Sequence, residues 1–313
     1  RAFEQASSEA TAAHKRIAGD TVLDLTCGLG VDALYLARHF RRVVALERDP
    51  LLARITADNL SRMGVANIEV VNSSAEEFLG REGLHFDWVY ADPDRRSAEG
   101  RKQVRLEACS PDIVALKPEI DRIAPRLCLK NSPLFDVDEA LRLFPGSCVE
   151  VVSSGDECKE VVVYADGSGP LVTATALGTG SFSARPGAAA PEAPAFDSAR
   201  YHWLVVPDVA LQKARLTRLH LAGKADCWSD LGFGFAEEEP HGIIGRVLPV
   251  ERIEPYDPKQ LKRELKGRGL ELLKRDFPLP AEELMRRLGT RPGADLRMAF
   301  TKIRNDFWAI RLK

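Results

Sequence analysis

The sequence predicts an α/β protein whose main sheet is mostly parallel with an antiparallel last strand, followed by a smaller α+β region. Two observations predict the sheet. Apolar strand segments alternate with helical segments from 22 to 130, the pattern of parallel strands joined by crossover helices. Two apolar segments, 147–153 and 158–164, then flank a glycine-containing turn at 154–157 that is typical of an antiparallel hairpin.

The individual elements follow from apolar segments and helix start signals. In the first region, strands are expected at 22–25, 42–46, 68–71, 86–91 and 127–130, with helices at about 31–38 and 136–143. In the second region, strands are expected at 201–207, 243–249, 269–275, 296–303 and 305–312, with helices at 208–221, 257–266 and 281–288. A stretch rich in proline and alanine, 183–198, predicts a linker. We therefore expect one domain over 1–182 and the α+β region over 199–313.

The composition is that of a soluble globular protein. The chain has 313 residues, 45% hydrophobic and 29% charged, which is enough for one large domain and a smaller one. No apolar run reaches the roughly 18 residues of a membrane span, and no signal-peptide pattern is present. The six cysteines are scattered without Cys-x-x-Cys spacing, so we expect a reduced, cytoplasmic protein that binds no metal. Because the chain begins with Arg1 rather than methionine, we expect a segment before it.

The charge is distributed unevenly. The net charge is -2, but residues 245–313 hold 17 Lys and Arg against 10 Asp and Glu. A basic region beside an acidic one indicates a polyanionic partner such as nucleic acid. Solvated helix faces also carry many lysines and arginines, so a purely structural reading stays open.

The most informative segment is 22–32, where an apolar strand runs into a glycine turn and a helix start. Gly28 and Gly30 would let a ligand approach the backbone closely. The spacing Gly28-x-Gly30-x-x-Ala33 also fits a dinucleotide fingerprint, so neighbouring segments must decide between ligands.

Those segments supply a carboxylate that could bind a ribose and a group of small residues that could border an adenine ring. Glu47 ends the second strand 19 positions after Gly28, where a carboxylate can accept both hydroxyls of a ribose. Ser73, Ser74 and Ala75 follow the third strand and suit the edge of an adenine ring. A capping box at the start of a helix explains the same residues.

Two carboxylates separate the possible ligands. Asp24 lies just before the glycine turn and Asp92 ends the fourth strand. Both would repel a pyrophosphate, whereas they suit a cofactor that carries an ammonium and a sulfonium. The sequence therefore disfavours a dehydrogenase.

Together these segments resemble the class I S-adenosylmethionine-dependent methyltransferases, which have a Rossmann-like sheet, over residues 1–180. The resemblance implies S-adenosylmethionine as cofactor and a catalytic loop at Asp92 and Pro93. The residues that it implies for cofactor binding are Asp24, Thr26, Cys27, Gly28, Gly30, Glu47, Ser73, Ser74, Ala75 and Asp92. Amino-methylating members usually have a second proline and an aromatic residue where this chain has Asp94 and Arg95.

The C-terminal segment 270–284 resembles the THUMP-like module of some bacterial methyltransferases, which we assign to 245–313. THUMP domains bind structured RNA, so the resemblance implies rRNA or tRNA as partner. Arg95 and Arg96 are candidates to bind a phosphate. Alternatively, they could form ion pairs with Asp94 in a structural loop.

Asp92 is the candidate catalytic residue because a carboxylate there could hold a substrate N–H so that the nitrogen lone pair faces the methyl group. Pro93 would fix the backbone of that loop. Carbon methylation at cytosine needs a thiolate, and Cys128, within the fifth strand, reads as a buried small hydrophobe. Nitrogen is therefore favoured as acceptor. Two alternatives stay open: a protein or small-molecule substrate, and a non-catalytic RNA-binding protein with a degenerate methyltransferase domain.

Overall fold

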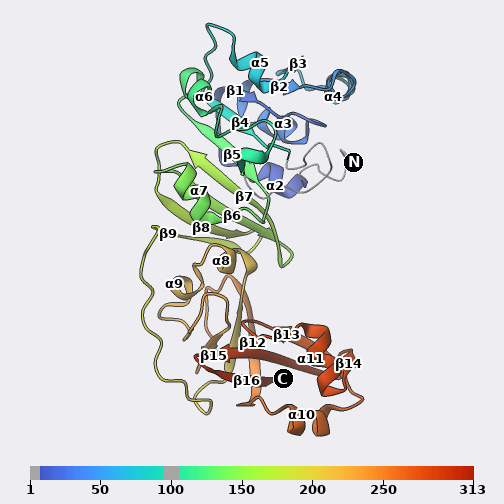
Figure 1. The fold of residues 1–313 in the computed structure, drawn as a ribbon, viewed down its shortest axis with the longest axis vertical. Helices are drawn as coiled ribbons and strands as arrows, with labels where there is room; N and C mark the ends of the chain where they lie inside the picture. The colour runs from blue at the N-terminus through green and yellow to red at the C-terminus, as the bar shows by residue number, and fades with distance from the viewer. Residues whose placement is uncertain (1–7, 95–105) are drawn as a thin grey trace. The chain divides into compact units, whose positions relative to one another are not determined.

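The computed structural model describes residues 8–94 and 106–313. The chain divides into two compact units, Arg1–Thr173 and Ala174–Lys313 (Figure 1). This division precedes the segment 183–198 that we expect to be a linker, which lies within the second unit. The domain boundary therefore stays a prediction.

The first unit is built on the predicted sheet. Its strands are β1 (Gly19–Asp24), β2 (Phe40–Glu47), β3 (Ile68–Asn72), β4 (Trp88–Ala91), β5 (Leu127–Asn131), β6 (Cys148–Ser154) and β7 (Glu157–Ala165). They lie in the order β3-β2-β1-β4-β5-β7-β6. Strands β1 to β5 pair in parallel, and β7 is antiparallel to both of its neighbours. The fold class predicted from the sequence is confirmed. A further strand, β8 (Leu171–Ala176), runs across the division between the units.

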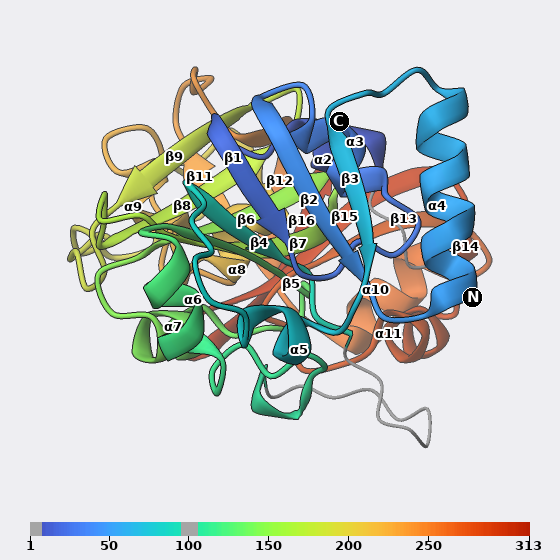
Figure 2. The same ribbon diagram turned by 90° about the horizontal axis from the view of Figure 1, so that it is seen from above.

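The helices of this unit are α2 (Glu9–Ala13), α3 (Val31–Leu36), α4 (Pro50–Arg62), α5 (Ala75–Leu79), α6 (Lys117–Ile123) and α7 (Val137–Leu143), with a short 3₁₀ helix at Leu106–Ala108. Polar side chains cap four of these helices, α2, α4, α5 and α7, among the described residues. Asp49 caps α4 through the amides of Leu51 and Leu52, and Pro50 occupies the first helical position. Figure 2 shows α4 beside β3, at the edge of the sheet.

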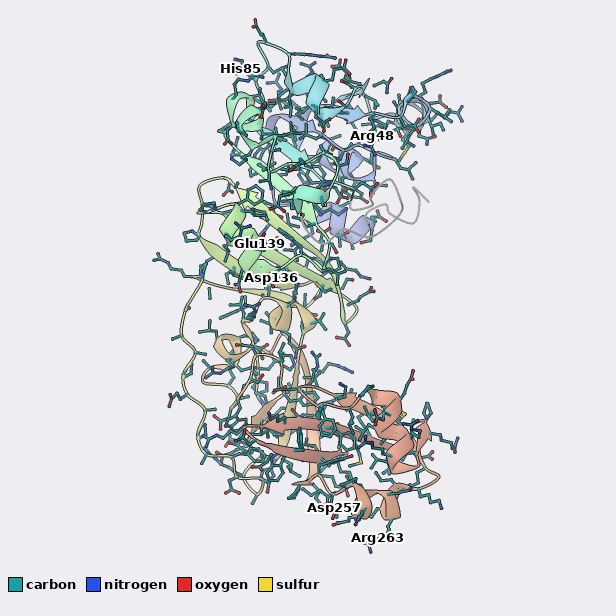
Figure 3. The ribbon with its side chains drawn as sticks, viewed as in Figure 1. Arg48, His85, Asp136, Glu139, Asp257 and Arg263 are labelled. Carbon is teal, nitrogen blue, oxygen red and sulfur yellow. The ribbon has the colours of Figure 1, made fainter. Side chains whose placement is uncertain are left out.

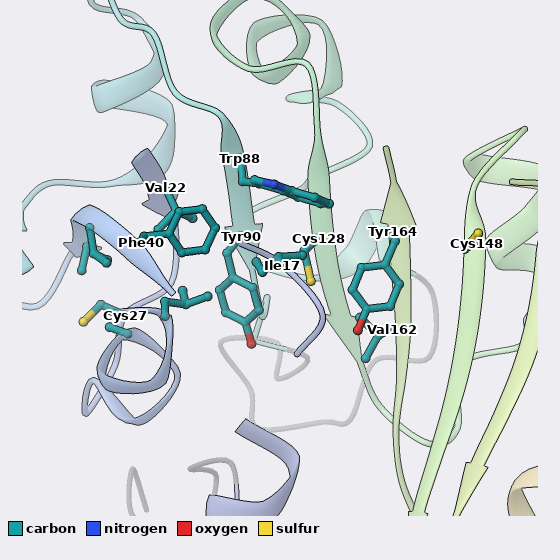
Figure 4. Packing of buried hydrophobic residues seen from close by; sticks show 14 residues of the cluster. Ile17, Val22, Cys27, Phe40, Trp88, Tyr90, Cys128, Cys148, Val162 and Tyr164 are labelled. Atoms are coloured by element: carbon teal, nitrogen blue, oxygen red, sulfur yellow. The ribbon is translucent and has the colours of Figure 1, made fainter. Parts of the chain in front are cut away.

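The core of the first unit packs on neighbouring strands. Tyr90, Cys128 and Tyr164 share one register row across β4, β5 and β7 and are buried (Figure 4). Burial raises the pKa of the Cys128 thiol. The structure thus confirms that Cys128 is a buried hydrophobe, and a thiol in this state is a poor nucleophile.

The second unit holds a separate seven-stranded sheet in the order β11-β10-β12-β16-β15-β13-β14. Its strands are β10 (Trp203–Pro207), β11 (Gly234–Ala236), β12 (Gly245–Pro255), β13 (Gly269–Lys274), β14 (Arg291–Pro292), β15 (Leu296–Ile303) and β16 (Asp306–Leu312), and β9 (Gly180–Ala184) precedes them. Helices α10 (Pro258–Leu265) and α11 (Ala281–Leu288) bury Leu261, Leu265, Leu284 and Leu288 in one cluster with Phe300 of this sheet.

One predicted helix differs from the structure. Instead of a single helix over 208–221, the chain forms α8 (Val209–Lys213) and α9 (Thr217–Leu221). The break falls at Arg215, whose φ of 56° lies in the left-handed region and so ends α8. Both helices bury a leucine, Leu211 in α8 and Leu221 in α9, so the apolar pattern continues through the break.

The proline-rich segment is tied to the second unit. The Pro194 carbonyl accepts a hydrogen bond from Trp228 Nε1 at 3.0 Å, and the Phe196 ring packs against Tyr201 and Trp308. Within the described residues, no helix is long and apolar enough to cross a membrane.

Candidate active site

The glycine turn joins β1 to α3 and is held from two sides. Gly28 and Gly30 have φ angles of 54° and 79°, which L side chains rarely adopt. A Cβ on Gly30 would lie 2.8 Å from Thr56 Cγ2. Thr56 Oγ1 donates a 2.7 Å hydrogen bond to the Gly28 carbonyl. The two glycines are therefore required by the geometry of this turn.

Glu47, at the end of β2, holds the same turn. Its Oε2 accepts a hydrogen bond from the Gly28 amide at 3.0 Å, and its Oε1 accepts one from the Asp49 amide at 2.8 Å. Cys27 lies beside it, with its amide bonded to the Leu46 carbonyl at 2.8 Å and its thiol buried. Glu47 thus shapes the loop, and contact with a ribose stays a prediction.

Asp24 presents a buried carboxylate to this loop. It is 1% exposed, and its Oδ1 accepts hydrogen bonds from the Thr26 amide and hydroxyl. Its Oδ2 is buried without a hydrogen-bond partner among the described residues. Burial raises the pKa of Asp24 to about 8, and the charges of Asp32 and Asp92 add to this rise. An unsatisfied buried carboxylate is costly, so the site fits a cationic group such as the ammonium of S-adenosylmethionine.

Asp92 follows β4 and forms an ion pair that the sequence did not predict. Lys130 Nζ, from β5, donates to Asp92 Oδ2 at 2.5 Å and lies 3.5 Å from Asp32 Oδ2. Burial raises the pKa of Asp92, Lys130 opposes that rise, and Asp32 adds to it. Burial lowers the pKa of Lys130, but Asp92 and Asp32 outweigh it, so this pKa is raised. The signal in the sequence was a lysine at the carboxyl end of a central strand.

The serines after β3 lie next to Glu47. Asn72, the last residue of β3, is the register partner of Glu47 in β2, and the Ser73 amide donates a hydrogen bond to the Glu47 carbonyl. Ser74 caps α5, where its Oγ accepts a hydrogen bond from the Glu77 amide at 3.2 Å. Ala75 is the buried first residue of α5. The capping interpretation therefore applies to Ser74, and an adenine contact by this segment stays a prediction.

The loop after Asp92 is only partly described. Asp94 and Ser110 exchange two backbone hydrogen bonds of 2.9 Å, so the chain on both sides of 95–105 is joined. Arg48, labelled in Figure 3, donates to Ser110 Oγ at 2.9 Å. Pro93 lies between Asp92 and this bridge. Arg95 and Arg96 lie outside the described residues, and their phosphate-binding role stays a prediction.

Two buried carboxylates in β6 and β7 are paired with cations from the segment after α2. Lys15 Nζ donates to Glu160 Oε1 at 2.5 Å. Glu150 is bound by His14 at 3.0 Å and Arg16 at 3.1 Å. Sequence reasoning missed these contacts, because the partners are more than 130 residues apart. Within the described residues, no group of three or more His, Cys, Asp or Glu side chains could hold a metal ion.

The chain is similar to known methyltransferases. Residues 22–99 match the family model described as a methyltransferase domain, and residues 245–313 match a THUMP domain-like family. An uncharacterized S-adenosylmethionine-dependent methyltransferase of Mycobacterium tuberculosis is 27% identical over 96% of this chain and 83% of its own. Ribosomal RNA small subunit methyltransferase J of Coxiella burnetii is 29% identical over 43% of this chain and 57% of its own.

A solved structure supports the fold over the whole chain. The crystal structure of a candidate methyltransferase from Porphyromonas gingivalis has a TM-score of 0.83 at 22% identity, covering 100% of this chain and 82% of that one. The fold and the similarity to methyltransferase families define the class: the chain is an S-adenosylmethionine-dependent methyltransferase with the class I sheet. A THUMP-domain-like region over 245–313 follows its methyltransferase domain.

Proposed function

We propose that this enzyme transfers a methyl group from S-adenosylmethionine to a nucleotide nitrogen of structured RNA, either rRNA or tRNA. The observation that carries the choice of RNA is a group of exposed cations in the THUMP-like region. An RNA substrate also favours the cytoplasm as the location of the protein.

These cations lie where two helices end. The Gly267 amide donates a 2.8 Å hydrogen bond to the Gly289 carbonyl, which joins the chain just after α10 to the chain just after α11. The cations around this junction are exposed, and we call them the basic patch; Figure 3 labels Arg263 among them. The basic patch consists of Lys262, Arg263, Lys266, Arg268 and Arg286.

The basic patch contrasts with arginines of the same region that are held by acidic partners. Within the described residues, none of its members forms an ion pair, whereas Arg287 pairs with Glu283 at 2.5 Å and Arg311 pairs with Glu264 at 3.2 Å. Cations in the last turn of a helix also stabilise that helix through its dipole, which is the structural alternative to a role in RNA binding. Five exposed charges lie near two helix ends that the Gly267–Gly289 hydrogen bond joins, and they suit the phosphates of a polyanion.

The site supports a nitrogen acceptor. S-adenosylmethionine supplies a methyl group on a sulfonium, which leaves as a neutral thioether when a nucleophile takes the methyl. Asp92 would accept a hydrogen bond from the acceptor N–H and so orient the nitrogen lone pair, and its carboxylate would take up the proton that the nitrogen releases after transfer. Pro93 would fix this loop, while Arg95 and Arg96 would bind a phosphate of the substrate.

The remaining residues would hold the cofactor. Asp24 would receive the ammonium at its unsatisfied oxygen, with Thr26 and Cys27 forming the backbone of the loop. Gly28 and Gly30 would admit the cofactor to the backbone. Glu47 would accept the ribose hydroxyls, and the segment from Ser73 to Ala75 would border the adenine.

The relatives named as ribosomal RNA methyltransferases favour RNA over the alternatives, although each matches less than half of this chain. The deciding experiment transfers radiolabelled methyl groups to total RNA from cells that lack the protein, with wild type and Asp92→Ala. Label in RNA that depends on Asp92 would support the proposal. Label in protein but not RNA would favour a protein substrate, and no label in any fraction would favour a non-catalytic RNA-binding protein.

A further inference from the structure

Lys130 is the one cation, among the described residues, within hydrogen-bonding distance of the Asp92 carboxylate. The ends of β4 and β5 lie side by side, since Ala91 pairs with Leu129 in the parallel register. Lys130 therefore projects beside Asp92, and its Nζ contacts Oδ2 at 2.5 Å. The side chain of Lys130 is 11% exposed and that of Asp92 is 28% exposed, so the contact is partly shielded from water.

The surroundings of this pair are strongly charged. Two carboxyl groups, Asp24 and Asp32, and two lysines, Lys130 and Lys15, interact with Asp92. Glu160 of β7 interacts in turn with Lys130. The side chains whose charge or titration couples to Asp92 are Asp24 of β1, Asp32 of α3, Tyr90 of β4, Lys130 of β5 and Lys15 of the segment after α2.

Stability alone does not explain a lysine here. A buried ion pair is often no more stabilising than apolar residues of similar volume, because desolvation of two charges offsets their attraction. Without Lys130, three neighbouring carboxyl groups, the buried Asp24 and the partly buried Asp32 and Asp92, would share one site. Like charges in such a site favour protonation. A protonated Asp92 would have an O–H donor where the proposed reaction needs an acceptor.

We propose that Lys130 is a positioning residue, which keeps Asp92 ionised and fixes its Oδ2 atom, so that Oδ1 remains to accept the N–H of the methyl acceptor. This inference rests on the proposed role of Asp92. The inference assigns Lys130, on a different strand, to the support of Asp92. It can be tested without any substrate.

The direct test follows the titration of the Asp92 carboxyl carbon by NMR in protein labelled with carbon-13 aspartate, with the signal assigned by Asp92→Asn. Lys130→Gln should move the Asp92 midpoint upward by about one pH unit or more, because a cation within 4 Å is lost. Lys130→Arg, which keeps the charge, should leave it nearly unchanged. Lys117→Gln, at an exposed lysine paired with Asp121 on α6, is the matched control. An unmoved midpoint in Lys130→Gln would overturn the proposal.

The reciprocal variant covers the case in which Lys130→Gln does not fold. Asp92→Asn preserves the shape of the side chain, and the Lys130 amine should then titrate at lower pH, because its ionic partner is gone. An unchanged amine titration contradicts the pairing.

Kinetics separate this proposal from the choice of substrate. With an active acceptor, Lys130→Gln should lose activity most strongly at low pH and recover part of it at high pH. In the Asp92→Asn background the same change should have no further effect. Multiplied losses in the double variant would mean that Lys130 does not act through Asp92. If wild type labels no RNA, the proposed substrate fails while the NMR titration still decides the role of Lys130.

Discussion

The backbone amide of Asp92 donates a 2.7 Å hydrogen bond to Thr26 Oγ1. This bond joins the end of β4 to the end of β1. The same hydroxyl lies 3.4 Å from Asp24 Oδ1, to which it donates. One threonine therefore sets the position of both carboxylates of the candidate active site relative to each other.

Thr26→Val should impair both stability and catalysis. The Asp92 amide would lose its acceptor, at a cost of about 1–2 kcal/mol in the free energy of unfolding, and methyl transfer should fall because Asp92 moves. Thr21→Val is the control, since Thr21 Oγ1 of β1 accepts from the Asp87 amide at 3.1 Å, while the Thr21 carbonyl accepts from the same amide and would keep it satisfied. Denaturant titration should therefore give the smaller loss for Thr21→Val, and only Thr26→Val should slow transfer. Equal rates in the two variants would contradict this role.

Gly30→Ala should weaken binding of S-adenosylmethionine. The positive φ alone costs about 1–2 kcal/mol for an L side chain, and the new Cβ would also press on Thr56. Gly64→Ala has a similar φ of 71° but meets nothing within 4 Å, so it should show the backbone cost alone. Calorimetry with S-adenosylmethionine should therefore detect weaker binding in Gly30→Ala only. Unchanged affinity would mean that the turn does not touch the cofactor.

Asp24 should make the protein without cofactor less stable as pH rises. Its pKa in the fold is about 8 against an ordinary 3.8, so the folded state holds a proton that the unfolded state has released between these values. The free energy of unfolding should therefore be highest below the ordinary value and fall as pH rises toward 8. Asp24→Asn should flatten this dependence. Unfolding by urea at pH 5 and pH 8 checks it, and parallel curves for both proteins would contradict it.

Substitutions at two adjacent arginines, Arg286 of the basic patch and Arg287 beside it, should have different effects on RNA binding. Arg286 has no acidic partner among the described residues, whereas Arg287 pairs with Glu283. Arg286→Gln should weaken RNA binding and reduce the slope of log affinity against log salt by about 0.7–0.9, the value for one phosphate contact. Arg287→Gln should change the slope less, since its charge is already compensated. Equal changes would indicate a diffuse electrostatic effect instead of a defined patch.

The sequence could predict the parts of this site that depend on short spacing. The turn from Asp24 to Gly30, and the carboxylate of Glu47 19 positions after Gly28, follow from the pattern of one strand–helix–strand unit. Lys130 could not be predicted in the same way, because its partner Asp92 is 38 positions away and contact depends on which strands are neighbours.

Sequence patterns also miss changes in backbone conformation and long-range charge pairs. The break between α8 and α9 depends on the left-handed φ of Arg215, a residue type that carries no such preference. Glu150 and Glu160 lie in apolar strand segments, where the sequence pattern predicts that an acidic side chain faces the solvent. Only the assembled sheet shows that His14, Lys15 and Arg16 are their partners.

That arrangement sets an order of events during synthesis. The segment from His14 to Arg16 is made well before the carboxylates that hold it, which lie about 135 to 145 residues further along the chain. These ion pairs can form only after β6 and β7 exist. A shortened protein that starts after Arg16 would leave Glu150 and Glu160 buried without their cations.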